Sequence, residues 1–279
     1  MLLDLHLGRP VTRGGLSIFP VFNGAAVGTR GYDLRSAALT VREHSSPVVE
    51  ELVVENTGAR PALVLEGELL EGGHQHRVAT QTVLVGAGQA HALPVRCVEQ
   101  SRWSGAHRQV RAGRRAPVRV RAAQDKGDAW QSVRMFEARH AYSPTHSLVE
   151  ASRTAEEQAA AAIADLRPLP FQTGVLVGVA GHPLLLEVFD SPRTLAHAWK
   201  ALLRSAALDA AGAAPVPTPG RRARRFLDRL DVVSLTSSPA GVGTALRGAS
   251  QHARLDVLVW RGRPAAVAAV NPRHELSAA

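Results

Sequence analysis

Short apolar runs separated by turn residues make up the first 122 residues of the chain. Glycine or asparagine lies in the gaps between the runs, as at Asn56-Thr57-Gly58 and at Gly86-Ala87-Gly88. Runs of this length with such punctuation are typical of strands, whereas Tyr32–Leu39 predicts a single helix. The predicted strands are Leu16–Phe22, Val48–Glu55, Ala62–Glu66, Val78–Val85 and Ala92–Val98.

The pattern changes after Gln124, where longer stretches rich in alanine and charged residues predict helices. Ser191 followed by Pro192 supplies an N-cap and a first-turn proline, so a helix is expected from there through Leu203. A proline-rich linker, Gly212–Gly220, follows it. The other predicted helices are Asp128–Ala138, Leu148–Leu166 and Arg221–Leu230, and the predicted strands are Gly174–Val179 and Leu184–Phe189, which form a hairpin, then Val232–Leu235, Leu255–Trp260 and Ala265–Val270.

These elements predict an α+β protein with a β-rich N-terminal part, sandwich or barrel-like, and a mixed α/β C-terminal part. We expect the first domain over residues 1–124 and the second region over 125–279, with the linker at 212–220. The chain has no run of 18 uncharged apolar residues and opens with no signal-like segment, so neither a membrane span nor secretion is expected. A single cysteine fits a reducing compartment, and the predicted location is the cytoplasm.

The formal net charge of +9 is concentrated in two places. Residues 96–121 contain eight arginines, and residues 221–229 contain five. Such stretches indicate an anionic partner, or else a solvated arginine-rich face. Nucleic acid ranks below a small phosphorylated ligand, because residues 104–129 contain no aromatic side chain for stacking and no known nucleic-acid-binding signature is present.

The densest polar chemistry lies in residues 66–103. Carboxylates, glycines, imidazoles, an amide and a guanidinium fall within EGELLEGGHQHR, residues 66–77, although a solvated polar turn would look similar. His74 and His76 would share one face of a strand, as metal ligands do. However, no glutamate follows about four residues later and no third histidine motif is present, so no metal is assigned and no cofactor is indicated.

The second half of this segment adds a possible nucleophile and an anion-binding pair. The predicted catalytic residues are Glu68 and Glu99, as acid/base groups, and Cys97, whose alternative is a small buried apolar role. A guanidinium beside an indole suits a phosphorylated ligand with a ring, unless the indole belongs to the core. The predicted ligand-binding residues are Gln75, Arg77, Gln100, Arg102 and Trp103.

Two motifs of this chain resemble those of the ADP-ribosylglycohydrolase- and rhodanese/phosphatase-associated protein family. They are EGELLEGGHQHR at residues 66–77 and LPVRCVEQSRW at residues 93–103, with weaker similarity at residues 16–22, 172–179 and 188–191. The chain departs from the family pattern at His74, His76, Arg96 and Ser101, where Lys, Asn, Ser and Gly are usual. The family is named for genomic neighbours that process ADP-ribose and phosphates, so the resemblance implies an ADP-ribose-like ligand. The residues that match the motifs are Glu68, Gln75, Arg77, Cys97, Glu99, Gln100, Arg102 and Trp103.

Three functions therefore remain open. The first is an enzyme or ligand-processing domain for an ADP-ribose-like or other phosphorylated nucleotide metabolite, in which paired carboxylates could hydrolyse a glycosidic bond. The second is a non-catalytic module that binds the same ligand class or a protein. The third is nucleic-acid binding by the basic stretches 96–121 and 221–229.

Overall fold

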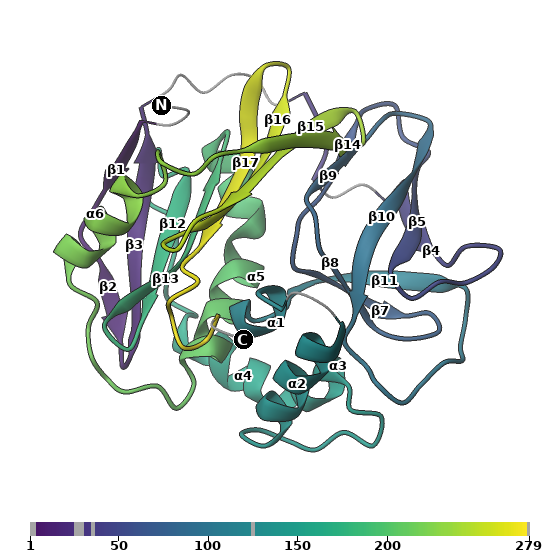
Figure 1. Ribbon diagram of the computed structural model, residues 1–279, viewed down its shortest axis with the longest axis horizontal. Coiled ribbons are helices and arrows are strands. Elements are labelled where there is room, and N and C mark those ends of the chain that lie inside the picture. Colours follow the sequence, from purple (N-terminus) through teal and green to yellow (C-terminus); the bar gives the residue numbers. More distant parts are fainter. Residues whose placement is uncertain (1–3, 25–30, 35–36, 124–125, 278–279) are drawn as a thin grey trace. The chain divides into compact units, whose positions relative to one another are not determined.

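The computed structural model describes residues 4–24, 31–34, 37–123 and 126–277 (Figure 1). The chain forms two compact units. The barrel unit contains residues 31–158 and 240–242, and the sheet unit contains residues 1–30, 159–239 and 243–278. The barrel unit is therefore inserted into the sheet unit, which differs from the division expected at residues 124–125. The reason is that the first strands pair with strands of the C-terminal half, which no local pattern reveals.

The barrel unit takes its name from a closed barrel in the order β10-β5-β4-β11-β7-β8, so the expectation of a barrel-like N-terminal part is confirmed. Alternating burial along β5 is typical of a strand with one face in a core. The barrel strands are β4 (Leu39–Arg42), β5 (Glu51–Asn56), β7 (Glu68–Gly72), β8 (Arg77–Ala79), β10 (Gln89–Cys97) and β11 (Arg108–Arg115). The unit also contains the paired strands β6 (Ala62–Val64) and β9 (Val83–Val85), and the helices α1 (Val118–Arg121), α2 (Lys126–Glu137) and α3 (Leu148–Ala151). Helix α4 (Arg153–Ala162) runs across the boundary of the two units.

The sheet unit is built on an antiparallel sheet with the strand order β1-β3-β12-β13-β17-β16-β15-β14. The short strand β2 also pairs with β3. Every residue of β12 is buried, and Figure 1 shows α5 and α6 beside the sheet on either side of its central strands. The strands are β1 (Leu5–Leu7), β2 (Val11–Arg13), β3 (Leu16–Asn23), β12 (Gly174–Val179), β13 (His182–Phe189), β14 (Thr236–Ala240), β15 (Gly243–Ala249), β16 (Arg254–Trp260) and β17 (Arg263–Val270). The helices of this unit are α5 (Pro192–Ala210) and α6 (Gly220–Asp228).

Helix α6 lies over one sheet face through a narrow apolar stripe. Ala223, Phe226 and Leu230 are buried in one cluster with residues of β3, β12, β13, β16 and β17. The rest of the helix is arginine-rich and faces away from this cluster. The predicted basic amphipathic helix is therefore confirmed, and the α+β class of the whole chain with it.

Four local predictions were wrong or incomplete. The predicted strand Val78–Val85 is divided into β8 and β9, which belong to different sheets. Tyr32–Leu39 is not helical in its described residues, because Asp33 hydrogen-bonds through its backbone to Pro61 and Leu63 instead of to its own turn; residues 35–36 lie outside the described part. The turn after α6 ends at Val232, residues 233–235 are irregular, and the strand begins only at Thr236. The predicted helix Leu148–Leu166 is divided into α3 and α4. No helix within the described residues is long and apolar enough to cross a membrane.

Candidate functional site

A polar network joins two segments at one end of the barrel unit: the turn between β7 and β8, and the segment after β10. Strands β8 and β10 pair Arg77 with Cys97, which brings the two segments together. The Gln75 amide donates to the Glu99 carbonyl at 2.9 Å, and the Ser104 backbone N–H donates to the His74 carbonyl at 3.1 Å. The two halves of the motif therefore form one site.

Glu99 is the centre of this network. Its side chain is only 1% exposed, and it accepts hydrogen bonds from Arg102, from the His76 backbone N–H at 2.9 Å and from the Thr145 hydroxyl at 2.9 Å. Burial alone would raise the pKa of Glu99, but the bonds from Arg102, His76 and Thr145 outweigh burial and lower it. Glu99 is therefore an ionised acceptor rather than a proton donor at neutral pH.

Arg102 clamps the segment after β10 onto the turn before β8. Nε and Nη2 contact the two Glu99 oxygens at 2.9 and 2.6 Å. Nη1 donates to the carbonyls of Gly73 and Ser104, both at 2.7 Å, and Nη2 donates to the Gly72 carbonyl at 3.2 Å. Since a guanidinium has five N–H donors, Arg102 has none left for a ligand.

Arg77 differs from Arg102 because its charge is buried without an ion pair. Its Nε donates to the Val49 carbonyl and its Nη1 to the Gln75 side-chain oxygen, both at 3.1 Å, and the residue is 0% exposed. Nη2 is buried and has no hydrogen-bond partner, and no carboxylate within the described residues forms an ion pair with this guanidinium. Burial lowers the pKa of Arg77, while the nearby Cys97, Glu43 and Glu99 act in the opposite direction.

Trp103 covers this guanidinium. The Arg77 Cζ lies 5.4 Å from the centroid of the indole, which is a cation–π distance. Trp103 itself is 48% exposed, and the His74 ring meets it edge-on at 5.5 Å. An aromatic ring open to solvent thus lies against a buried, incompletely bonded cation.

The Cys97 thiol is enclosed beside Arg77. It donates toward the Glu99 carbonyl at 2.9 Å and the Gln75 side-chain oxygen at 3.1 Å, and it is fully buried. Burial raises the pKa of this thiol. The Glu99 backbone amide, Trp130 and Arg77 act in the opposite direction, but their combined effect is smaller. A protonated, buried thiol packs and hydrogen-bonds, and it is a poor nucleophile.

Three further residues of the site were missed by the sequence analysis: Thr145, whose hydroxyl donates to Glu99, and the pair Glu43 and Gln109. Glu43, directly after β4, accepts from the His74 backbone N–H at 2.9 Å and from the Gln109 amide at 3.1 Å. The second carboxylate oxygen of Glu43 and the side-chain oxygen of Gln109 are buried and have no partner. Only barrel closure brings β4 and β11 beside the motif, so no signal in the sequence marks these two residues.

The two histidines of the motif lie in a turn rather than on a strand. His76 Nδ1 accepts from the Gly72 backbone N–H at 2.9 Å, and its Nε2 lies 3.8 Å from Glu99. Burial lowers the pKa of His76, with Glu99 opposing, so the ring is neutral at pH 7. In the described part of the chain no three residues of the His, Cys, Asp and Glu types are grouped so as to hold a metal ion.

Two of the predicted site residues make their side-chain contacts outside this network. Glu68 on β7 forms a two-pronged ion pair with Arg111, at 2.8 and 3.1 Å. Gln100 accepts from Arg134 of α2 at 2.9 Å. The residues that direct contacts bring together are Gln75, Arg77, Cys97, Glu99, Arg102 and Trp103, joined by Glu43, His74, His76, Gln109 and Thr145.

Glutamates neutralise much of the basic stretch 96–121. Besides the pairs of Arg102 and Arg111, Arg114 contacts Glu71 and Glu156, and Arg121 contacts Glu66. All of these pairs are at most partly exposed. Arg102, Arg111, Arg114 and Arg121 are thus part of the interior framework of the barrel unit, whereas Arg108 of β11 is exposed.

Comparisons with known proteins agree with the two motifs of this site. No curated protein and no solved structure matches the chain significantly. A known family does match, over residues 4–270, which cover both units and the whole network around Glu99 and Arg77. The chain therefore belongs to the ARG and Rhodanese-Phosphatase-superfamily-associated Protein domain family.

Proposed function

We propose that this protein binds a small phosphorylated ligand with a ring, of the ADP-ribose or nucleotide type, at Arg77 and Trp103. The observation that carries the proposal is the unpartnered Nη2 of a fully buried arginine. A buried cation without an ion pair is unfavourable, and an anionic ligand group would offset that penalty. The exposed indole beside it offers a stacking surface for the ring.

Access to Arg77 requires the Trp103 side chain to move. The indole contacts the guanidinium, yet nearly half of the residue is open to solvent. In the proposed complex the indole turns outward and stacks on the ligand ring, while the phosphate reaches Nη2. Trp103 fluorescence should therefore change on binding.

Binding without turnover is favoured over catalysis by the three residues first considered. Glu68 and Glu99 are each held by an arginine, and Cys97 is buried with a raised pKa. The two carboxylates are thus occupied by arginines, and the enclosed thiol is a poor nucleophile. The second candidate is hydrolysis of the same ligand with Glu43 as base, and one observation supports it: a buried Glu43 oxygen without a partner.

Calorimetric titration with ADP-ribose tests the proposal, with AMP and inorganic phosphate for comparison. We expect ADP-ribose to bind more tightly than phosphate, and Arg77→Gln to weaken binding at least ~10-fold, since a charge-assisted hydrogen bond is lost. Arg108→Gln is the matched control, because this exposed arginine lies on β11 and has no ion pair in the described residues. Equal weakening by both substitutions, or no heat with any ligand, would refute the proposal.

Trp103→Phe and Glu43→Gln complete the experiment. The first should abolish the fluorescence change while it retains part of the affinity. The second separates the two candidates: slow release of product by the natural chain, lost in Glu43→Gln, would select hydrolysis, and its absence on long incubation would select binding alone. A cytoplasmic location belongs to this proposal as well, supported by the free thiol of Cys97.

A further inference from the structure

The five arginines of the second basic stretch have no carboxylate partners within the described residues, unlike Arg102, Arg111, Arg114 and Arg121 of the barrel unit. They are carried by helix α6 and its C-cap, and none forms an ion pair within the described residues. Arg222 instead donates to the Gly181 carbonyl at 2.7 Å and contacts His182 Nε2 at 3.3 Å. The excess positive charge of the chain is therefore least compensated at this helix. The five residues are Arg221, Arg222, Arg224, Arg225 and Arg229.

One side of α6 borders a hollow of about 350 Å³ that is lined with cations and contains no carboxylate. Three of its arginines recur along the helix, one turn apart, so their side chains lie on the same face. The first residues of β13 and the segment after β17 form the opposite wall. The polar lining residues are Arg222, Arg225, Arg229, Arg273, His182 and Asn271.

The opposite wall is fixed by its own hydrogen bonds. Asn271 donates through its side chain to the Pro183 carbonyl at 2.8 Å and accepts from the Arg273 backbone N–H at 3.1 Å. Partial burial lowers the pKa of His252, and the positive charges of Arg229 and Arg273 lower it further. The arginines thus converge on a preformed wall rather than spreading over a convex surface.

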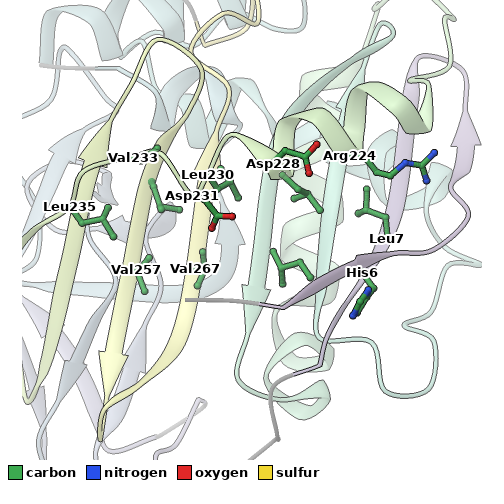
Figure 2. Close-up of a pocket in the computed structure, with 13 residues that line it drawn as sticks. His6, Leu7, Arg224, Asp228, Leu230, Asp231, Val233, Leu235, Val257 and Val267 are labelled. Atoms are coloured by element: carbon green, nitrogen blue, oxygen red, sulfur yellow. The ribbon is translucent and has the colours of Figure 1, made fainter. Parts of the chain in front are cut away.

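The other side of α6 borders a different hollow, of about 660 Å³, shown in Figure 2. Its floor is apolar, with Leu230, Val257 and Val267, and Asp228 and Asp231 are at its rim. Two carboxylates make that hollow unsuitable for an anion. The two sides of α6 therefore differ in charge: carboxylates are present at the larger hollow, whereas the charged residues at the smaller hollow are all cations.

We propose that the 350 Å³ hollow binds the diphosphate, or a similarly multiply charged phosphate group, of a small ligand. Guanidinium forks match phosphate oxygens, and two linked phosphates balance four arginines better than a single one. The volume is near the lower end of the usual ~300–1,000 Å³ range for small-ligand sites. Phe226, the phenylalanine in its lining, is only 4% exposed, so the lining offers no exposed Phe, Tyr or Trp ring for the stacking that single-stranded nucleic acid uses. The inference is independent of the function proposed for Arg77.

Titration with inorganic pyrophosphate tests it, with orthophosphate as the weaker comparison. Arg225→Gln/Arg229→Gln should reduce pyrophosphate affinity at least ~10-fold, because each lost guanidinium removes charge-assisted bonds. Arg221→Gln/Arg224→Gln removes the same charge from the same helix outside this hollow, and should change affinity less than ~2-fold. Circular dichroism of both variants establishes that α6 is retained.

Three results would overturn the inference. Equal losses in the two double variants would mean that the helix acts as a diffuse charged surface. Tighter binding of a short single-stranded RNA than of pyrophosphate, lost equally in both, would assign the helix to nucleic acid. Loss of pyrophosphate binding in Arg77→Gln would locate the anion in the barrel unit, and that result would leave the proposed function standing.

Discussion

Replacement of Arg102 by methionine should destabilise the barrel unit strongly. The substitution keeps an unbranched side chain but removes the cation that holds Glu99, a carboxylate only 1% exposed. Two donors to Glu99 remain, the His76 backbone N–H and the Thr145 hydroxyl. Neither donor carries a charge, and the His76 ring is neutral as well, so the variant retains a buried, uncompensated anion.

The structure sets the size of the effect. Breaking a buried ion pair by removal of one partner costs about 3–5 kcal/mol. The three carbonyl bonds of Arg102, to Gly72, Gly73 and Ser104, would each add about 1 kcal/mol if nothing replaced them. Water replaces much of that contribution because Ser104 is exposed. We therefore expect a loss of about 4 kcal/mol in the free energy of unfolding at pH 7.

Urea unfolding followed by circular dichroism measures this loss, with Arg108→Met as the exposed control. Glu99→Gln in the Arg102→Met background removes the stranded charge and should restore about 2 kcal/mol. Because the pKa of Glu99 is lowered in the folded protein, its stabilisation is complete above the unfolded pKa and is lost as pH falls through the folded pKa. The variant lacks this contribution, so the difference between the two proteins should shrink below about pH 4.5. A difference under about 1 kcal/mol at pH 7, or no rescue by Glu99→Gln, would refute the reasoning.

Three further predictions concern the same site. Gly73→Ala should lower the free energy of unfolding by about 2–4 kcal/mol, because φ is +57° and the added Cβ would lie 1.8 Å from the Gln109 amide nitrogen. Gly88→Ala is the control: φ is +65° but the space around it is open, so the loss should be only about 1 kcal/mol. Chemical denaturation of the two variants compares the two losses. Cys97 should react with a thiol reagent at least ~100-fold more slowly in the folded than in the urea-unfolded protein, since it is buried and its pKa is raised; equal rates would contradict the burial. The lowered pKa of His76 means that the unfolded chain binds its proton first, so stability should fall as pH drops from 7.5 towards 5; His76→Gln should reduce that slope, and an unchanged slope in stability measurements would count against a neutral, buried ring.

Elements with strong local signals were predictable from the sequence. Ser191 caps α5 by accepting from the Thr194 backbone N–H, and Pro192 occupies the first turn as expected. The hairpin of β12 and β13 turns through Ala180 and Gly181, both at positive φ. In each case two or three neighbouring residues determine the backbone, so the pattern is sufficient.

Elements decided by distant partners were not predictable. Strand β11 is rich in arginine, which hides its strand character, and its charges make sense only beside the glutamates of β7 and α4. The two motifs contained eight of the residues that meet at the site, because β8 and β10 pair directly. Glu43 and Gln109 could not be assigned to the site from the sequence. The different environments of Arg77 and Arg102 could not be predicted either, because the hydrogen-bond partners of each guanidinium are known only in the folded chain.

The insertion of the barrel unit affects how the protein is made. Strand β3 pairs with β12, and about 150 residues separate the two along the chain. At roughly 5–20 residues per second, the ribosome exposes β3 for about ten seconds or more before its partner emerges. Six consecutive residues of β3 are buried in the final sheet, so the waiting strand is prone to self-association. Pro20 lies within this run and cannot donate a ladder hydrogen bond, which disfavours pairing with another copy. The contiguous residues 31–158 can fold meanwhile and draw the two ends of the sheet unit together, so β12 finds its partner already nearby.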